Sequence, residues 1–333
     1  MSRSEASPVF VLADGPFVDA DLVGPLFAAA GVTLRRAVLD SPSAVAAATA
    51  DADGVVLVTN PLPAELVAAL APTVKVVGRA GVGLDAIDLA AVAAHGVSVF
   101  HTPDYCVDEV ATHAVAMALA LNRRLLAADA VVRRDWTSWR ELTPVAPLHE
   151  QTVGIVGLGL IGRAVARRFA TLAGEVVGFD PMPASEVEDV HRAATVDELL
   201  ERSDIVSLHI PLTAETERIV DAAALERMKP GALLVNVSRG GLVDEAALIA
   251  ALSSGQLAGA ALDVFASEPL GLDDPLLTAP NLLLSPHFAW YSSGSERGVW
   301  AQTIDGMLAV LRGEAPPSGR IAAQPTAPSL SAE

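Results

Sequence analysis

The sequence predicts an α/β protein with two domains, each built on a doubly wound, mainly parallel sheet, and with a cleft between the domains. Three observations predict this class. The chain has 333 residues, which suits about two domains of ~150 residues each. Short runs rich in β-branched residues alternate with helical patterns, as in parallel sheets with right-handed crossovers. This alternation occurs on both sides of Thr102-Pro103-Asp104, so the same plan is used twice.

The first α/β unit occupies the residues before Thr102. Its strands are expected at 8–13, 33–39, 54–59, 74–77 and 97–100. Its helices are expected from the Asp14-Gly15-Pro16 turn to Ala30 and at 43–50, 64–70 and 89–94. Gly31 ends the first helix and Asn60-Pro61 precedes the third, because glycine and proline interrupt helical patterns.

The second unit follows a long helical pattern at 107–126 and an irregular stretch at 135–147. Its strands are expected at 152–156, 175–179, 204–208, 232–237, 259–263 and 281–284. Its helices are expected at 163–172, 196–201 and 222–228, the third ending at Lys229-Pro230-Gly231, and a last helix of the chain is expected at 298–312. Residues 315–333 are rich in Pro, Ala and Ser, so disorder is expected there.

Composition excludes several classes of partner. The net charge is −18, so neither nucleic acid nor anionic lipid is an expected ligand. The longest apolar helical run, 114–121, is far shorter than the ~20 residues of a membrane span, and the N-terminus lacks a signal-peptide plan. The single cysteine, Cys106, suits a reducing cytoplasm and is expected to be a packed apolar residue rather than a redox-sensitive thiol. The scattered histidines indicate no metal site.

A dinucleotide-binding pattern begins at Gly157-Leu158-Gly159-Leu160-Ile161-Gly162, between an apolar strand and a helical pattern. Gly157 permits the tight turn, Gly159 lets backbone N–H groups approach a pyrophosphate, and Gly162 lets the helix lie close to the strand. Asp180, at the end of the next strand, can accept hydrogen bonds from a ribose diol. A lone GxGxxG fits any glycine-rich turn. The surrounding strand, helix and acid favour a Rossmann-like nucleotide site.

The acid at this site also predicts which nicotinamide cofactor binds. Asp180 would repel a 2′-phosphate, and Pro181-Met182-Pro183 brings no arginine to replace it. NAD is therefore expected rather than NADP.

Arg239, Glu268 and His287 each follow one of the last three predicted strands. Ligands of open α/β sheets bind outside the carboxyl ends of the strands. Arginine binds a carboxylate bidentately, and histidine can transfer the proton that accompanies hydride transfer. A glutamate beside the histidine favours its imidazolium form. Taken singly, Arg239 could be a loop cap, Glu268 an acid in a turn before proline, and His287 an ordinary loop histidine. Taken together, the three residues predict a site for a 2-keto acid.

Five motifs together resemble the D-isomer-specific 2-hydroxyacid dehydrogenases, over about residues 9–312. They are Gly157-x-Gly-x-x-Gly with Asp180, Asn236-x-Ser-Arg-Gly, Asp263-Val-Phe-x-x-Glu-Pro, Ser285-Pro-His and Gly78-Arg-Ala-Gly-Val-Gly. The resemblance implies two Rossmann-like or flavodoxin-like domains. Residues 1–102 and 288–333 would form a discontinuous substrate-binding domain, and 103–287 would form the NAD-binding domain. It also implies a homodimer, formed through the nucleotide domain.

The resemblance assigns roles residue by residue. Arg239 would bind the substrate carboxylate, Glu268 would pair with His287, and His287 would donate the proton. Arg79, the Val82 backbone, Arg239 and the aromatic Trp290 would line the substrate pocket. The implied cofactor-binding residues are Gly157, Gly159, Leu160, Ile161, Gly162, Asp180, His209, Pro211, Val237, Ser238, Asp263 and His287, of which Asp263 would contact the nicotinamide carboxamide.

The function expected from this set is NAD-dependent reduction of small, unphosphorylated 2-keto acids, since Arg79 is the chief basic group foreseen in the substrate pocket. A 3-phosphoglycerate dehydrogenase is one alternative. The other is an NAD(H)-sensing interaction protein, because residues 103–110 and 287–292 are similar to the branch that contains the C-terminal-binding-protein corepressors. His101 departs from the family pattern, in which asparagine is common.

Overall fold

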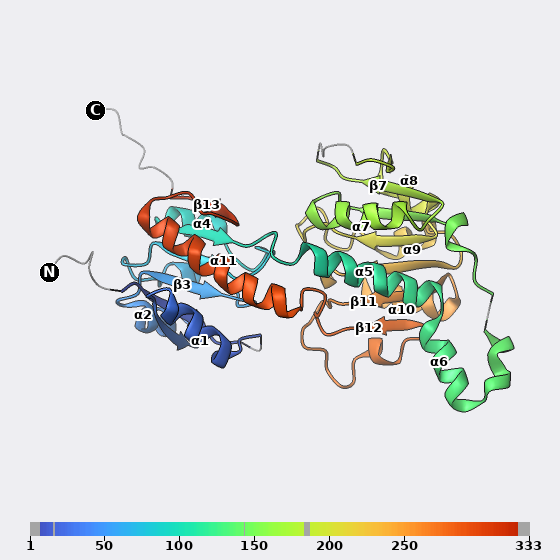
Figure 1. Ribbon diagram of the computed structural model, residues 1–333, viewed down its shortest axis with the longest axis horizontal. Coiled ribbons are helices and arrows are strands. Elements are labelled where there is room, and N and C mark those ends of the chain that lie inside the picture. The colour runs from blue at the N-terminus through green and yellow to red at the C-terminus, as the bar shows by residue number, and fades with distance from the viewer. Residues whose placement is uncertain (1–6, 16, 143, 183–186, 326–333) are drawn as a thin grey trace. The chain divides into compact units, whose positions relative to one another are not determined.

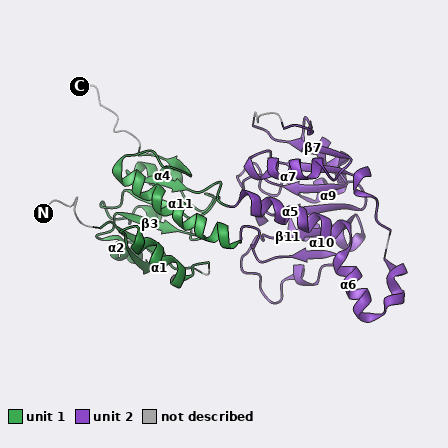
Figure 2. Cartoon of the chain, in the orientation of Figure 1, with its two compact units in different colours: residues 1–105, 292–333 green, residues 106–291 purple. Residues whose placement is uncertain are grey.

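The computed structural model describes residues 7–15, 17–142, 144–182 and 187–325. The chain forms two compact units (Figure 2). Unit 1 comprises residues 1–105 and 292–333, and unit 2 comprises Cys106–Tyr291. Each unit is an α/β domain around a mainly parallel sheet, as the sequence predicted. The sequence-based boundaries, 103 and 287, lie slightly before the limits of unit 2. Pro183 and residues 326–333 lie outside the described residues.

Unit 1 contains a six-stranded sheet in the order β13-β5-β4-β3-β1-β2 (Figure 1). The strands are β1 (Val9–Ala13), β2 (Thr33–Ala37), β3 (Gly54–Leu57), β4 (Val76–Arg79), β5 (Ser98–His101) and β13 (Arg320–Ala323). The helices are α1 (Ala20–Ala29), α2 (Pro42–Thr49), α3 (Ala64–Val67), α4 (Leu89–Ala94) and α11 (Ser293–Arg312). All neighbouring strands are parallel except β13, which pairs antiparallel with β5.

Helix α11 belongs to unit 1 because it packs on that unit's sheet. Met307 of α11 lies so close to Gly54 and Gly78 that a Cβ at these glycines would be 2.8 and 2.2 Å from it. The helix begins five residues before the expected start at 298, since Ser292 and Ser295 form a reciprocal capping box. Unit 1 is therefore discontinuous in sequence.

The expectation of disorder for residues 315–333 is wrong for the described part. Residues 320–323 form the edge strand β13, which contacts β5 through Arg320, Ile321 and Ala323. Gly319 has φ +72, and a Cβ there would lie 2.6 Å from the carbonyl oxygen of His101. Composition indicated a flexible tail, but pairing with an exposed sheet edge overrides that preference.

Unit 2 contains a seven-stranded parallel sheet in the order β12-β11-β10-β9-β6-β7-β8. The strands are β6 (Thr152–Val156), β7 (Glu175–Phe179), β8 (His191–Arg192), β9 (Ile205–Leu208), β10 (Ala232–Asn236), β11 (Leu257–Leu262) and β12 (Leu282–Leu284). The helices are α5 (Val107–Asn122), α6 (Leu125–Arg134), α7 (Leu160–Ala170), α8 (Val196–Arg202), α9 (Ala222–Arg227) and α10 (Glu245–Ser254), with 3₁₀ turns η2 (Trp136–Glu141), η3 (Leu148–Glu150), η4 (Gly240–Leu242) and η5 (Pro275–Thr278).

The helix expected at 107–126 is in fact two helices. Arg124 has φ 50, in the left-handed region, so α5 ends at Asn122 and α6 starts in a new direction at Leu125. The apolar pattern runs across this break, which is why periodicity alone missed it. Helix α10 and strand β8 were also not predicted.

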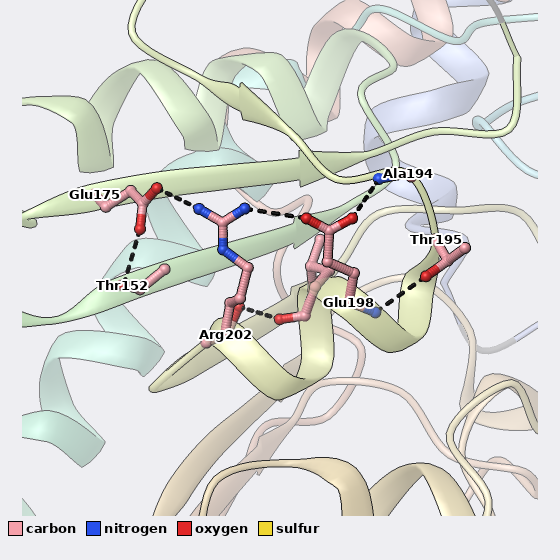
Figure 3. A network of polar contacts seen from close by, with 8 residues as sticks. Thr152, Glu175, Ala194, Thr195, Glu198 and Arg202 are labelled. Carbon is pink, nitrogen blue, oxygen red and sulfur yellow. Dashed lines mark hydrogen bonds and ion pairs between the residues drawn. The ribbon is translucent and has the colours of Figure 1, made fainter.

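A polar network ties the amino ends of β6 and β7 to α8 (Figure 3). Arg202 lies 2.6 Å from a Glu175 oxygen and 3.1 Å from a Glu198 oxygen. Glu175 also accepts a hydrogen bond from Thr152, and Glu198 accepts one from the backbone N–H of Ala194. The network joins β6, β7 and α8, and so supports the strand that carries Asp180 at its end.

Candidate functional site

The glycine loop of unit 2 has an open side where a ligand can approach. Gly157 has φ +96, and a Cβ there would lie 2.4 Å from the His209 carbonyl oxygen. A Cβ at Gly162 would lie 1.9 Å from the carbonyl oxygen of Gly157, so α7 packs directly on the turn. A Cβ at Gly159, in contrast, would meet no atom within 4 Å. Two glycines are therefore required by the fold, while Gly159 keeps space outside the loop.

The start of α7 suits a pyrophosphate. Gly159 is the N-cap residue and offers no side chain to the first backbone N–H groups of the helix. These N–H groups, which include those of Leu160 and Ile161, combine with the helix dipole to favour an anion. The open side at Gly159 and the uncapped helix fit the diphosphate of a dinucleotide.

Asp180, after the end of β7, holds the glycine loop. Its carboxylate accepts hydrogen bonds from the backbone N–H groups of Leu158, at 2.7 Å, and Met182, at 2.9 Å. Each carboxylate oxygen can accept a further bond, so contact with a ribose diol remains compatible with this structural role.

Arg192 is a neighbour of Asp180 that the sequence argument missed. It lies on β8, which pairs with β7, and its Nη2 donates to the Asp180 carbonyl oxygen at 3.0 Å. The sequence-based expectation of NAD rests only on Asp180 and the residues directly after it. The two-residue strand β8 carries no sequence signal, and only the pairing of strands reveals the arginine.

His209, after β9, lies beneath the glycine loop. Its Nε2 lies 2.8 Å from Ser207 Oγ, and among the described residues its buried Nδ1 has no hydrogen-bond partner. Burial lowers the pKa of His209 to about 3, so the ring is neutral at pH 7. Its place beside Gly157 and Gly162 shows that it supports the loop. Pro211 lies two residues further along this segment.

Val237, Ser238 and Arg239 form the turn after β10. Ser238 Oγ donates to the Leu208 carbonyl oxygen at 2.7 Å, and Asn236 Nδ2 donates to the Arg239 carbonyl oxygen at 2.8 Å. The next residue, Gly240, lies against the Phe265 backbone, where a Cβ would come within 1.8 Å. The turn that carries Arg239 is thus held directly against the loop that leads to Glu268.

Glu268 and His287 are brought together by these loops. Nδ1 of His287 donates to Oε2 of Glu268 at 2.7 Å, and the Phe265 N–H donates to Oε1 of Glu268 at 2.9 Å. Burial acts to raise the pKa of Glu268, but the bond and charge of His287, the Phe265 N–H and the Arg239 charge outweigh it, and the pKa is lower than usual. Arg239 is therefore close enough to act on Glu268 electrostatically.

The backbone of His287 is held in an uncommon conformation. Its φ is 53, and its N–H donates to the Asp263 carbonyl oxygen at 2.8 Å. Non-glycine residues rarely adopt this conformation, and such residues cluster at functional sites. The surrounding bonds thus fix the direction of the imidazole.

Asp263 fixes this loop through its buried carboxylate. It accepts hydrogen bonds from Ser285 Oγ and from the N–H groups of Phe288 and Ala289, the latter at 2.8 and 2.9 Å. Because Ser285 donates its single hydrogen to Asp263, the His113 Nε2 at 3.0 Å must donate to Ser285 Oγ. Asp263, expected to contact the nicotinamide, therefore also orients His287. His113 was not foreseen, since it lies on α5 in no recognisable motif.

The candidate substrate residues of unit 1 lie at the carboxyl end of β4. Arg79 is the last residue of β4, and its Nη1 donates to the Ala80 carbonyl oxygen. The following loop is anchored by Thr102, whose Oγ1 accepts from the Gly81 N–H at 2.9 Å. His101 Nδ1 donates to the Val82 carbonyl oxygen at 3.0 Å. Trp290 lies in unit 2, with its ring 5.5 Å from that of Tyr291.

Two further features are plain among the described residues. No cluster of three or more His, Cys, Asp or Glu side chains is placed to hold a metal ion, and no helix is long and apolar enough to cross a membrane. Cys106 is buried, with 2% of its surface exposed.

Comparison with known proteins agrees with this geometry. A family model described as D-isomer specific 2-hydroxyacid dehydrogenase, NAD binding domain, matches residues 115–289. A glyoxylate reductase from Thermofilum pendens is 39% identical over 268 residues, which are 79% of each chain. A D-3-phosphoglycerate dehydrogenase from Mycobacterium tuberculosis is 37% identical over 312 residues, covering 92% of this chain and 57% of that protein. This chain thus spans little more than half the length of that relative.

Solved structures give the same result. An NADPH-dependent glyoxylate/hydroxypyruvate reductase from Sinorhizobium meliloti, in complex with NADP and malonate, has a TM-score of 0.83 and 29% identity, covering 97% of this chain and 100% of that one. A D-2-hydroxyisocaproate dehydrogenase has a TM-score of 0.79 and 26% identity, covering 94% and 99%. With a family model over more than half of its length, this chain belongs to the D-isomer-specific 2-hydroxyacid dehydrogenase family.

Proposed function

We propose that the protein is an NAD-dependent D-2-hydroxyacid dehydrogenase that reduces 2-keto acids. The observation that carries this proposal is the 2.7 Å bond between His287 Nδ1 and Glu268, with Arg239 beside it. Bound NADH supplies a hydride to the carbonyl carbon. The protein supplies the proton, binds the carboxylate and orients both.

His287 acts as the proton donor in this proposal. Its Nδ1–H is engaged by Glu268, which leaves Nε2 to give a proton to the carbonyl oxygen as the hydroxyl forms. Because the pKa of Glu268 is lowered, its carboxylate remains charged and stabilises the imidazolium before the transfer. Asp263 and Ser285 keep the loop of His287 in place.

Arg239 binds the substrate carboxylate in this proposal, and its guanidinium also polarises the neighbouring carbonyl. Arg79 and the Val82 backbone in unit 1, and Trp290 in unit 2, are each proposed to contact the substrate. Gly157, Gly159 and Gly162 with the α7 N-terminus hold the diphosphate, and Asp180 holds the ribose and favours NAD.

An NADH-oxidation screen of about twenty 2-keto acids tests the proposal. We expect turnover of at least one acid by the wild type, with His287→Ala at background. Trp290→Ala should change the ranking of the acids, because it removes an aromatic wall. Tight NADH binding without turnover of any acid would instead support an NAD(H)-sensing protein.

We also propose a homodimer formed through unit 2. Large exposed apolar side chains gather on α6 and η2, which project from the rest of this unit (Figure 1). They are Leu125, Leu126, Val132, Trp136 and Trp139, with 53–72% of their surfaces exposed. We call the segment of α6 and η2, residues 125–141, the arm. A cavity of about 700 Å³, lined in part by Leu126, lies beside it. Several large apolar side chains left exposed on one segment are typical of a protein interface.

Light scattering after gel filtration tests this assembly. We expect about twice the 34.3 kDa of one chain for the wild type. Trp136→Glu should yield monomers, because a charge would be buried at the interface. Leu272→Glu is the matched control, since Leu272 is 99% exposed and lies outside the arm. A monomeric wild type would contradict the proposal.

A cytoplasmic location is proposed from the single buried cysteine, and cell fractionation tests it.

A further inference from the structure

Three basic residues of unit 1 form one row across neighbouring strands. Arg79 of β4 lies opposite His101 of β5, and His101 lies opposite Arg320 of β13. Arg79 and His101 are the last residues of their strands, so the row lies at the carboxyl end of both. The carboxyl ends of parallel strands are where α/β sheets bind ligands.

The three side chains share one face of the sheet. Residues directly opposite one another on paired strands point to the same side. Val77 and Val99, two positions before Arg79 and His101, both belong to a single apolar cluster and therefore point to the same face of the sheet. Side chains two residues apart on a strand share a face, so Arg79 and His101 point to that face as well. The row is therefore a property of the strand register and does not depend on one side-chain conformation.

The electrostatics of His101 show that the row is close-spaced. Burial is the largest cause that lowers the pKa of His101, and the Val82 carbonyl opposes it. Arg320 and Arg79 lower the pKa further through like-charge repulsion, while Asp104 acts in the opposite sense. Both arginines thus act on the same imidazole.

Arg320 owes its place to a close approach of the backbone. Gly319 has φ +72, and a Cβ there would lie 2.4 Å from the Phe100 ring and 2.6 Å from the His101 carbonyl oxygen. Among the described residues no carboxylate forms an ion pair with Arg320. In a chain of net charge −18, three adjacent basic residues at a strand end require an explanation.

The row also adjoins the loop assigned to the substrate. His101 Nδ1 donates to the carbonyl oxygen of Val82, and the loop begins directly after Arg79. A group bound at the row would therefore lie beside a substrate held by this loop. Arg79 is the chief basic group expected from the sequence, because Arg320 lies far along the chain in a stretch expected to be disordered.

We propose that Arg79, His101 and Arg320 bind a second anionic group of the substrate, a carboxylate or a phosphate at the end away from the keto acid. This rests on the proposed function and names its substrate class. Arginine forks pair bidentately with both anions, and His101 adds a donor when an anion favours its protonation. This proposal favours dianionic 2-keto acids over the small, unphosphorylated acids expected from the sequence.

Matched substrate pairs test this subsite. The first pair is 2-oxoglutarate and 2-oxopentanoate, which have the same chain length and differ in the distal carboxylate. The second is 3-phosphohydroxypyruvate and hydroxypyruvate, which differ in the phosphate. The readout is the ratio of kcat/KM for the dianionic member to that for its partner. A ratio above one in the first pair identifies a carboxylate as the bound anion, and a ratio above one in the second pair identifies a phosphate.

We expect Arg320→Gln to lower the favoured ratio by about tenfold or more, since it removes a charge-assisted contact. Arg320→Lys should keep most of the ratio, because it keeps the charge. Arg312→Gln is the control: Arg312 is an exposed residue of α11 that pairs with Glu314, and its loss should leave the ratio unchanged. Thermal melts of all variants report on folding.

Four outcomes would overturn the inference. A wild type with ratios of one or below in both pairs lacks the subsite. A ratio that Arg320→Gln leaves unchanged, or a loss shared equally by both members of a pair, shows that Arg320 does not read the second anion. If no member of either pair turns over, this inference fails, and the proposed function fails as well only if the wider screen of about twenty 2-keto acids also shows no turnover.

Discussion

The buried His209 predicts an acid-dependent loss of stability in the nucleotide-binding unit. The folded state holds the pKa of His209 at about 3, against an ordinary value of 6.5. Below pH 6.5 the unfolded chain binds a proton at this residue, while the folded chain does not. The free energy of unfolding therefore falls as the pH decreases, and the full penalty is present only below pH 3.

The size of this effect follows from the shift. One pKa unit corresponds to 1.36 kcal/mol. Between pH 7 and pH 5 the unfolded histidine becomes almost fully protonated, so the penalty grows by about 2 kcal/mol over that range. The residue as a whole is only partly buried although its Nδ1 is covered, and water near the ring would reduce the penalty, so this value is an upper limit.

His209→Gln provides the perturbation. Glutamine does not titrate and can still bond to Ser207 Oγ. Urea unfolding of the wild type and the variant, followed by tryptophan fluorescence at pH 7, 6 and 5, gives the free energy of unfolding of each. Other groups titrate alike in both proteins, so the difference between the two pH profiles isolates His209.

We expect the wild type to lose up to about 2 kcal/mol more than the variant between pH 7 and 5. Because His209 lies beneath Gly157 and Gly162, the NADH dissociation constant should rise with acid in the wild type more than in the variant. Parallel pH profiles for the two proteins would refute a neutral, buried His209.

Four further predictions concern catalysis and cofactor choice. His287→Ala should lower kcat by ~10² to 10⁴ and leave the NADH dissociation constant nearly unchanged, as judged by steady-state rates and fluorescence titration. Arg239→Ala should raise KM as well as lower kcat, because it holds the carboxylate in the ground state too; an unchanged KM would contradict its role. Asp180→Ala should raise kcat/KM with NADPH, and adding Arg192→Ala should abolish the gain, since Arg192 would face the 2′-phosphate; equal values for the single and double variants would exclude Arg192. Ser285→Ala should lower kcat with little change in KM and shift the pH profile of kcat, because it loosens the loop of His287; a change in thermal stability alone would limit Ser285 to a structural role.

Much of this protein was determined by local sequence. The glycine loop, the helix start at Leu160 and the acid at 180 follow from short patterns that act within one strand–turn–helix unit. Arg239, Glu268 and His287 could be grouped from sequence because β10, β11 and β12 are neighbours in one parallel sheet, whose carboxyl ends share an edge. Their roles remain predictions, but their position needed only strand order.

The tertiary structure decided what depends on contacts distant along the chain. The bond between His113 and Ser285 joins residues 172 positions apart, and no motif connects them. Strand β8 has only two residues, too few for a periodic signal, and β13 lies in a stretch whose composition indicated disorder; both form by pairing with a neighbouring strand. Arg192 beside Asp180 and Arg320 beside His101 follow from that pairing. Local pattern thus determines where a strand ends, whereas register between strands determines which charges meet there.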